Sequence, residues 1–474
     1  MKKIVLVAFA LMLLVPTVHA TQARLAGMGL ANWMIADDAN MWMNPVYVKD
    51  YSGGAWWDMG TNAAAITAGQ WGGATMGTAL GTFGAFFSRP YVGVGTAAIR
   101  YGTNGAPAVA GVPVDDVLNA SSAAFYPALS FFGLNGAQQI TNLVATAPAN
   151  KVDIFFAPSF LPIAFAYNFA KAGGYAQYEY WTSPNKANGD GYQYNEAYTY
   201  EHNIGVGLRL ADLIPVLPIE IAGVLGLPTV NNHYHESTWN NGNQKFDTTD
   251  EILTTPGAFN LAVSARMPVE LLGQSTIVFG QYALSNLPAI LTDTWDNDVD
   301  AALDGDYQMD RTYSRTAING GISVNKEIGE GLLVVAVGGM YTVTSYTAEE
   351  TDPTGGVVAN LGKYTRTTTA IGIPINIAYE HPLSFFGLMG RAGLAFTPAW
   401  GSVETVDQDY LVSVLANERK VIIPADATVP VAITLGLGKD ITDTLSVDLL
   451  VNQAAVNGIL GALTTQMTIN WMFQ

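Results

Sequence analysis

The 474-residue chain contains no cysteine, which excludes disulfides, thiol catalysis and cysteine-ligated zinc sites. Charged residues are also scarce, at 13% of the chain against about 25% in ordinary globular domains. After residue 20 no apolar run reaches the roughly 20 residues that a transmembrane helix needs. The formal charge of −18 at pH 7 argues against nucleic acid as a partner, because such binding requires a basic surface.

Residues 1–20 have the pattern of a secretory signal peptide. Two lysines at positions 2 and 3 precede an apolar run over residues 4–15, and Ala20 is the small residue that signal peptidase accepts. The run is too short to span a bilayer as a helix. We therefore expect the segment to be removed on export, which places the mature start near Thr21.

The most abundant pattern in the rest of the chain is alternation of apolar with small or polar residues. Successive side chains of a strand point to opposite faces, so each alternating segment has one apolar face. The pattern predicts an all-β fold, a transmembrane antiparallel β-barrel of about 14–16 strands over residues 52–474, with sixteen by direct count. The clearest segments are residues 204–210, 259–267, 318–324, 371–379, 428–437, 445–452 and 466–473.

The links between these segments alternate in length, which is typical of outer-membrane barrels with short periplasmic turns and long external loops. We therefore predict a bacterial outer-membrane location, with lipid around the wall and the barrel assembly machinery as a partner during biogenesis. Residues 91–150 are nearly uncharged and predict a large apolar loop that covers or enters the barrel. The short links are residues 211–216, 268–273, 326–330, 381–386 and 439–442, and the predicted external loops are 229–256, 285–310, 348–362 and 403–426.

The N-terminal region carries a family resemblance. Residues 23–31 read Ala-Arg-Leu-Ala-Gly-Met-Gly-Leu-Ala, residues 36–39 read Ala-Asp-Asp-Ala, and an Asn-Pro step follows. This resembles the mature N-terminus of FadL-like outer-membrane transporters of hydrophobic compounds and of the related PorV-like secretion proteins, although Val46 stands where that family has alanine. The resemblance implies that residues 21–51 form a hatch that plugs the barrel. Its motif residues here are Gly27, Gly29, Asp37, Asp38, Asn44 and Pro45.

The same resemblance implies a path by which a ligand leaves sideways through the wall. Pro158 and Pro162 interrupt an apolar segment, residues 152–169, and proline has no N–H to donate to a strand ladder. Two interpretations remain open at this point. The segment is either one kinked strand beside a lateral gap or two short strands joined by a tight turn.

Alternation also places charged residues on the inner face of the predicted barrel, namely Arg209, Arg266, Glu380 and Asp448. Buried charges must be paired or hydrated, so their presence indicates a wet lumen or a salt-bridge network. These side chains either attach the plug to the wall, which we favour, or contact a passenger molecule. Asparagines expected on the same face are Asn203, Asn260, Asn319, Asn325, Asn376, Asn452 and Asn470.

The sequence shows no catalytic constellation, so we predict no enzyme activity, no cofactor and no metal site. It has no nucleophile elbow and no glycine-rich loop that opens a helix. His233 and His235 have a spacing that could share a metal, and the acidic residues between 293 and 310 could bind calcium. Solvated external loops are the default interpretation of both segments.

Three functions follow from these observations. The first is passive, gated uptake of hydrophobic small molecules such as fatty acids, which the resemblance to FadL-like lipid transport implies. The second is a general diffusion porin. The third is a PorV-like partner in protein export that transports nothing itself, for which the long acidic loops would form the binding surface.

Overall fold

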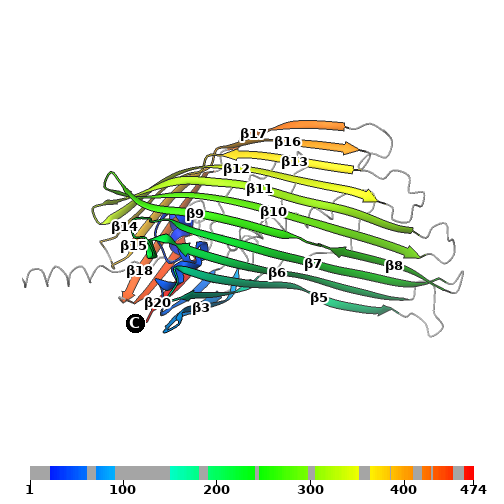
Figure 1. Ribbon diagram of the computed structural model, residues 1–474, viewed down its shortest axis with the longest axis horizontal. Coiled ribbons are helices and arrows are strands. Elements are labelled where there is room, and N and C mark those ends of the chain that lie inside the picture. Colours follow the sequence, from blue (N-terminus) through cyan, green and yellow to red (C-terminus); the bar gives the residue numbers. More distant parts are fainter. Residues whose placement is uncertain are drawn as a thin grey trace, which may run out of the picture.

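The structure is a computed structural model that describes residues 22–60, 71–90, 150–180, 191–240, 245–296, 305–351, 363–384, 386–408, 419–428, 431–442, 444–451 and 464–473. Nearly all of these residues are in β-strands (Figure 1). The predicted signal peptide, and the predicted loop at 91–150 apart from Asn150, lie outside the described residues. The helices are α2 (Gln22–Met28), η1 (Asn32–Met34), α3 (Asn40–Met43), η2 (Pro45–Lys49) and η3 (Leu210–Asp212).

All the strands belong to one antiparallel sheet. In chain order they are β1 (Gly54–Gly60), β2 (Trp71–Thr78), β3 (Gly81–Pro90), β4 (Asn150–Pro158), β5 (Ile163–Tyr180), β6 (Gly191–Arg209), β7 (Glu220–Asn240), β8 (Lys245–Thr254), β9 (Phe259–Leu271), β10 (Gln274–Asp296), β11 (Gly305–Ile328), β12 (Gly331–Thr351), β13 (Lys363–Gly372), β14 (Ile375–Pro382), β15 (Met389–Phe396), β16 (Ala399–Gln408), β17 (Arg419–Thr428), β18 (Val431–Thr442), β19 (Leu445–Val451) and β20 (Thr464–Met472).

The sheet closes on itself because β20 pairs with β1, with Met472 opposite Gly54. At four positions around the wall, two consecutive strands lie end to end and pair with successive parts of the same neighbouring strand, so that together they count as one strand of the barrel. Both β8 and β9 lie between β7 and β10. The successions β13 to β14, β15 to β16 and β17 to β18 fill three further places in the same way. The 20-stranded sheet is therefore a closed barrel with sixteen places, which confirms the predicted fold class.

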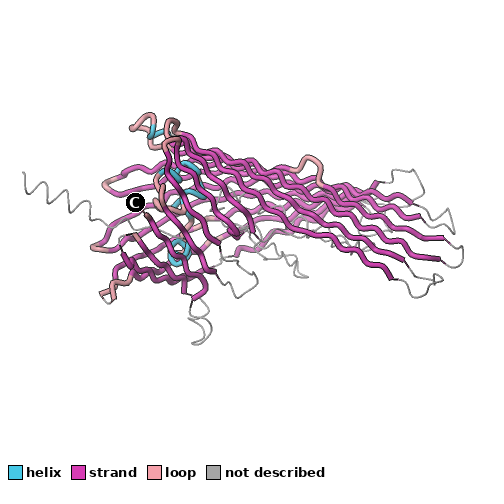
Figure 2. Tube along the Cα trace, turned by 90° about the horizontal axis from the view of Figure 1, so that it is seen from below, coloured by secondary structure: helices cyan, strands magenta, loops and turns pink. Residues whose placement is uncertain are grey.

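The barrel has a short-turn end and a long-strand end. At the short-turn end, tight links join β2 to β3, β9 to β10 and β11 to β12. Strands β1 to β4, β19 and β20 have only 7 to 10 residues, whereas β5 to β7 and β10 to β12 have 18 to 24. The long strands therefore continue past the closed ring as a curved sheet (Figure 2).

The predicted external loops are largely strand, which corrects the sequence interpretation. Strand β7 continues to Asn240 and β8 occupies much of the predicted loop 229–256, while β10 and β11 extend into 285–310. Strands β16 and β17 occupy both ends of 403–426, and residues 352–362 lie outside the described residues. An antiparallel strand does not need an apolar face where it is solvated. The strands therefore remain paired beyond the residues at which the apolar alternation of the sequence stops.

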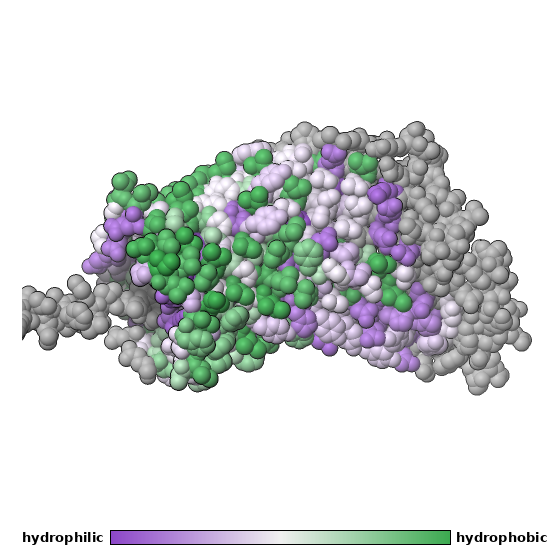
Figure 3. All heavy atoms as spheres, viewed as in Figure 1, coloured by the Kyte–Doolittle hydropathy of each residue, from purple (hydrophilic) through white to green (hydrophobic). Residues whose placement is uncertain are grey.

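The outer surface near the short-turn end is an apolar belt (Figure 3). The surface over the long-strand end is more hydrophilic in the same view. Exposed apolar patches wider than a few hundred Å² are rare on soluble monomers and mark contact with lipid or protein. Within the described residues, no helix is long and apolar enough to cross a membrane. Exposed members of the belt are Ile204, Val206, Ile221, Leu225, Ile318, Ile322, Val335, Val337, Tyr341, Tyr379, Trp471 and Phe473.

The wall is not kinked at Pro158 and Pro162, so the predicted lateral gap there is wrong. Strand β4 ends at Pro158, β5 begins at Ile163, and the two pair with each other from Lys151 opposite Ala170 to Phe156 opposite Phe165. The prolines bound a tight turn because neither has to donate a ladder hydrogen bond there. Strand interruptions occur instead at residues 255–258, 373–374 and 397–398, which contain Pro256, Pro374 and Pro398.

Candidate functional site

Residues 22–50, here called the N-terminal segment, lie inside the ring of strands (Figure 2). Helix α2 contacts β14, β15, β18, β19 and β20, whereas η2 contacts β3, β4, β5 and β6 from another part of the wall, and η1 contacts β10 and β11. Nearly all of its side chains are buried. The segment therefore lies inside the closed ring near the short-turn end, in contact with several parts of the wall.

The predicted glycines end α2 and let it approach the wall. Gly29 has φ +61°, and the N–H groups of Leu30 and Gly29 donate to the carbonyls of Leu25 and Ala26 at 3.0 and 3.1 Å. This is a Schellman cap, in which a left-handed residue is best supplied by glycine. A Cβ atom on Gly27 would lie 2.9 Å from Cα of Gly436 in β18. Glycine is therefore required for this contact between helix and strand.

The Asp37-Asp38 step forms a buried turn. Asp37 accepts a hydrogen bond from the N–H of Ala39 at 3.0 Å, and its own N–H donates to Oδ1 of Asn40 at 2.8 Å. Asp38 accepts from Nε1 of Trp56 in β1 at 2.7 Å and from Nδ2 of Asn470 in β20 at 3.0 Å. The step therefore joins the N-terminal segment to the two strands that close the barrel.

The Asn44-Pro45 step serves both the turn and the wall. Oδ1 of Asn44 accepts from the N–H of Val46 at 3.1 Å, and Pro45 occupies the first turn of η2, where a missing N–H is tolerated. Nδ2 of Asn44 donates to the carbonyls of Leu208 and Ile221, in β6 and β7, at 3.3 and 3.4 Å. The departure from the family pattern at Val46 leaves this turn intact.

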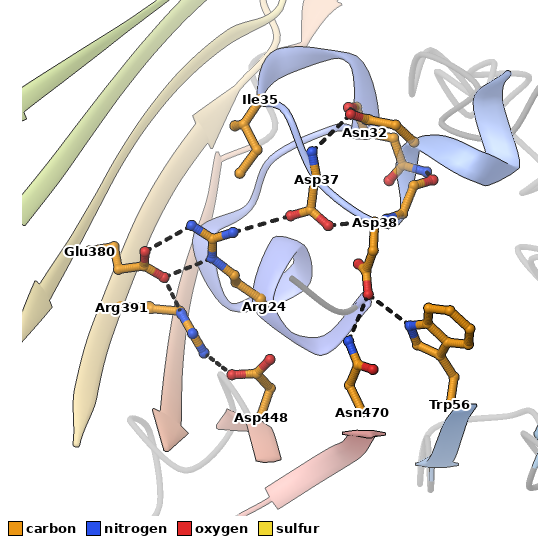
Figure 4. A network of polar contacts seen from close by, with 12 residues as sticks. Arg24, Asn32, Ile35, Asp37, Asp38, Trp56, Glu380, Arg391, Asp448 and Asn470 are labelled. Carbon is orange, nitrogen blue, oxygen red and sulfur yellow. Dashed lines mark hydrogen bonds and ion pairs between the residues drawn. The ribbon is translucent and has the colours of Figure 1, made fainter. Parts of the chain in front are cut away.

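A chain of buried ion pairs connects α2 to the wall (Figure 4). Arg24 donates through Nε and Nη2 to both carboxylate oxygens of Glu380, each at 2.8 Å, and through Nη1 to Asp37 at 3.3 Å. Arg391 joins Glu380 to Asp448, with both distances 2.5 Å. Such bidentate arginine–carboxylate geometry is both strong and directional. Two predicted inner-wall residues, Glu380 and Asp448, thus belong to one network.

The guanidinium of Arg266 holds a second part of the N-terminal segment. It donates to the carbonyls of Trp33 and Ile35 at 3.3 and 2.8 Å, and to Oδ1 of Asn40 at 3.1 Å. It also pairs with Glu220 at 3.4 Å, whose carboxylate accepts from the hydroxyl of Tyr47. Almost every donor of Arg266 is therefore directed at the segment or at a carboxylate that binds it.

Arg209 lies at the edge of the barrel, apart from these networks. It pairs with Asp50 at 2.6 Å and with Asp212 at 2.8 Å, and its side chain is 20% exposed. All four charged residues predicted for the lumen therefore have partners, and all four are linked to the N-terminal segment directly or through a neighbour. The sequence interpretation missed Arg391 and Glu220, although Arg391 directly faces Glu380 across the β14–β15 ladder.

The tryptophans of the segment pack against wall aromatics. Trp42 makes edge-to-face contacts with Trp71, Phe86 and Phe155, with ring centroids 4.7 to 5.8 Å apart. The guanidinium of Arg89 lies 3.6 Å from the ring centroid of Trp42. These contacts are ordinary core packing, and edge-to-face geometry adds about 0.5–1.5 kcal/mol of stabilisation per pair beyond the area that is buried. They strengthen the attachment of the segment.

The histidine pair and the acidic run lie on strands rather than in loops. His233 and His235 are on β7, and both approach Oδ1 of Asp250 on β8, at 2.6 and 3.4 Å. The acidic run begins in β10 and ends in β11, while residues 297–304 lie outside the described residues. In the part of the chain that is described, no three histidine, aspartate or glutamate side chains are grouped to hold a metal ion.

Asp38 is the buried acid with the clearest electrostatic perturbation. Burial raises the pKa of its carboxyl well above the ordinary value of 3.8, and the adjacent Asp37 raises it further. Because the pKa of Asp38 is higher in the folded than in the unfolded protein, protonation of Asp38 stabilises the folded protein. The contribution is full at pH values below the pKa of the unfolded state. That contribution is lost as the pH rises through the folded pKa.

The substitution Asp38→Asn is therefore expected to stabilise the protein at high pH. Asparagine keeps an oxygen acceptor for Trp56 and Asn470 but cannot ionise. Thermal unfolding at about pH 8 should show a midpoint a few degrees above that of the native protein, with the difference vanishing at about pH 4. Asp50→Asn, at the exposed edge, is the matched control. A midpoint that falls equally at both pH values would contradict a raised pKa for Asp38.

No protein-family model matches the chain, and no curated protein matches it. Among solved structures, a mutant of the ferric enterobactin receptor PfeA from Pseudomonas aeruginosa aligns over 89% of this chain and 80% of its own, with 8% identity and a TM-score of 0.23. We draw no functional conclusion from that likeness.

Proposed function

We propose that the protein is a bacterial outer-membrane β-barrel for passive, gated passage of hydrophobic small molecules such as fatty acids, with the N-terminal segment as the gate. The observation that carries this proposal is that the segment lies inside the ring, contacts several parts of the wall and is attached by directional polar contacts. Arg24 and Arg266 make several of those contacts, and Asp38, Asn44, Tyr47 and Asp50 make others. The attachment is not polar alone, because apolar side chains of the segment and of the wall also form one buried cluster.

The apolar belt supports the membrane location in this proposal. Its exposed residues alternate with buried ones along β6, β7, β11 and β12, as expected for strands with one face toward lipid. Trp471 and Phe473, at the short-turn end, are exposed and in mutual contact with ring centroids 5.8 Å apart. Aromatic side chains of this kind favour the boundary between lipid and water.

A segment lodged inside the ring supports gated passage over a general diffusion porin, because a porin keeps an open aqueous channel. The wall beside the segment is continuous at Pro374, because the N–H of Gly338 donates to the carbonyl of Pro374 and the N–H of Ile373 to that of Pro398, each at 2.9 Å. Asn376, two residues after Pro374, donates to the carbonyl of Gly29 at 2.8 Å. Movement of α2 would release this contact, and we propose that this movement accompanies opening of the passage.

Uptake by cells tests the proposal. The protein would be expressed in a Gram-negative host that lacks its own transporter for hydrophobic compounds, and entry of radiolabelled oleate would be compared with entry of a labelled disaccharide. We expect oleate uptake to rise while disaccharide uptake stays at the background level. A rise in disaccharide uptake would indicate a porin, and no rise in either would favour the export-partner function.

A further inference from the structure

The long strands on one side of the barrel continue well beyond the short strands (Figure 1). Strand β6 has 19 residues and β7 has 21, whereas roughly 9–11 residues of a tilted strand cross the hydrocarbon core of a membrane. On the outward face of β7 the apolar residues end at Leu227, and Thr229 and Asn231 follow. Because short turns are periplasmic in outer-membrane barrels, the remaining part of each strand, roughly ten residues, lies at the level of the outer-leaflet headgroups.

The outward face of this extension is rich in aromatic side chains. On β6 the even-numbered residues face outward, because the odd-numbered residues from Thr199 to Gly207 are buried. On β7 the odd-numbered residues face outward, because Asn232 and Tyr234 are buried. About 20 Å of strand separates Tyr192 from Tyr198, so the aromatic region is deeper than a single girdle at the hydrocarbon boundary. The tyrosine–histidine face is defined as Tyr175 of β5, Tyr192, Tyr194 and Tyr198 of β6, and His233 and His235 of β7.

The rings of the tyrosine–histidine face hold one another in place. Tyr192 stacks on His235 with ring centroids 5.3 Å apart, and its hydroxyl is hydrogen-bonded to Nε2 of that histidine at 2.9 Å. Tyr194 makes edge-to-face contacts with His233 and Tyr175, each with ring centroids 5.2 Å apart. Tyr175 and Tyr192 nevertheless remain 55% and 36% exposed. Exposed rings that are already fixed in orientation lose little conformational freedom when they bind a partner.

The charged groups among these rings do not favour an anionic partner. Lys171 of β5 lies over the ring of Tyr198, with Nζ 4.8 Å from the ring centroid. Glu196 accepts a hydrogen bond from the hydroxyl of Tyr194. Asp250 of β8 approaches the imidazole nitrogens of both histidines, at 2.6 and 3.4 Å. The two carboxylates repel a phosphate group, whereas they can accept hydrogen bonds from hydroxyl groups.

Position and chemistry together define the partner. The outer leaflet of a bacterial outer membrane presents glycolipids, whose sugars surround any part of a barrel that projects through the headgroup layer. Sugar rings combine apolar C–H faces with hydroxyl rims, which match aromatic rings that carry phenol, imidazole and carboxylate groups at their edges. We propose that the tyrosine–histidine face binds the uncharged sugars of outer-leaflet glycolipid. This inference depends on the membrane location in the proposed function but not on what passes through the barrel.

Glycolipid binding to the full-length mature protein in phospholipid nanodiscs tests this inference. The probes are two lipopolysaccharides with the same lipid A and the same acidic inner-core sugars, of which only one carries the uncharged hexoses of the outer core. Native mass spectrometry after release from nanodiscs that contain both probes gives their relative affinity. We expect the hexose-bearing form to bind about tenfold more tightly, a difference of about 1.4 kcal/mol.

Two variants locate the binding. Tyr175→Ala combined with Tyr192→Ala removes the two most exposed rings of the face and is expected to abolish the tenfold preference. Heat-modifiable migration checks that this barrel is closed, since both side chains face away from the interior. The matched control is Tyr341→Ala on β12, an outward tyrosine of the apolar belt that is 41% exposed, which should keep the full preference.

The outcomes separate this inference from the proposed function. Equal affinity of the native protein for the two lipopolysaccharides would overturn the sugar site, and so would a preference that survives the double variant. Loss of binding of both probes in Lys171→Met would assign the contact to phosphate and overturn the sugar site as well. A hexose preference in a protein that takes up no oleate would support the sugar site while the proposed passage fails. A protein that does not insert into nanodiscs would overturn both.

Discussion

Removal of residues 22–50 is expected to convert a barrel that conducts no ions into one with steady, ohmic conductance across a planar bilayer. The N-terminal segment lies inside the native ring, and its side chains are almost entirely buried. Without it, the inner wall would keep Arg266, Glu380 and Asp448 facing a water-filled lumen. Charged lumen walls of this kind support ion flow in wide barrels.

The conductance measurement needs the native protein beside the deletion, both refolded in the same detergent. Heat-modifiable migration would show that the deleted barrel is closed. Should the deletion fail to fold, Arg24→Ala combined with Arg266→Ala keeps the chain length and is expected to give frequent openings. Steady conductance from the native protein would refute the gate, because the ring would then be open with the segment in place.

The second large effect is expected from Arg266→Ala. This arginine donates to four groups of the N-terminal segment and pairs with Glu220, and it is 3% exposed. Removing one partner of a buried ion pair costs about 3–5 kcal/mol, because the other charge stays buried and uncompensated. The segment should therefore leave its seat far more often, while the strands remain paired.

Thiol labelling measures this release directly. The chain has no cysteine, so Met41→Cys introduces a single thiol at a position that is 1% exposed. In the Arg266→Ala background its labelling by a water-soluble maleimide should be on the order of a hundredfold faster or more, because the substitution destabilises the attachment of the segment by about 3–5 kcal/mol. Arg209→Ala, at the exposed edge, is the control and should have little effect, since exposed pairs contribute about 0–1 kcal/mol. Equal rates in all backgrounds would mean that Arg266 does not hold the segment.

Much of the barrel could be predicted from alternation because lipid or core contact imposes a period of two on one face of each strand. Residues 204–210 and 318–324 are strands for this reason, and the count of sixteen places followed from such segments. Apolar alternation did not predict strands in regions where neither face of the strand has to be apolar. Residues 229–240 of β7 are polar on both faces, so nothing in their sequence distinguished a solvated strand from a loop.

The sequence predicted many residues of the candidate site but not which of them contact each other. Gly27, Gly29, Asp37, Asp38, Asn44 and Pro45 were singled out by a short motif, and each has a local structural reason in the turns that it forms. The inward direction of Glu380 and Arg266 followed from strand parity. Pro158 and Pro162 were ambiguous because proline ends a strand and bends one by the same loss of a donor.

The sequence by itself determined that this chain is a barrel, that many of its strands have one apolar face, and that charges lie on the inside. Only the tertiary structure decided which charges meet. Arg24 and Glu380 are 356 residues apart along the chain. Their pairing depends on closure of β20 onto β1 and on the depth at which α2 sits. Neither depends on local propensity, because strand register and barrel closure are properties of the whole wall.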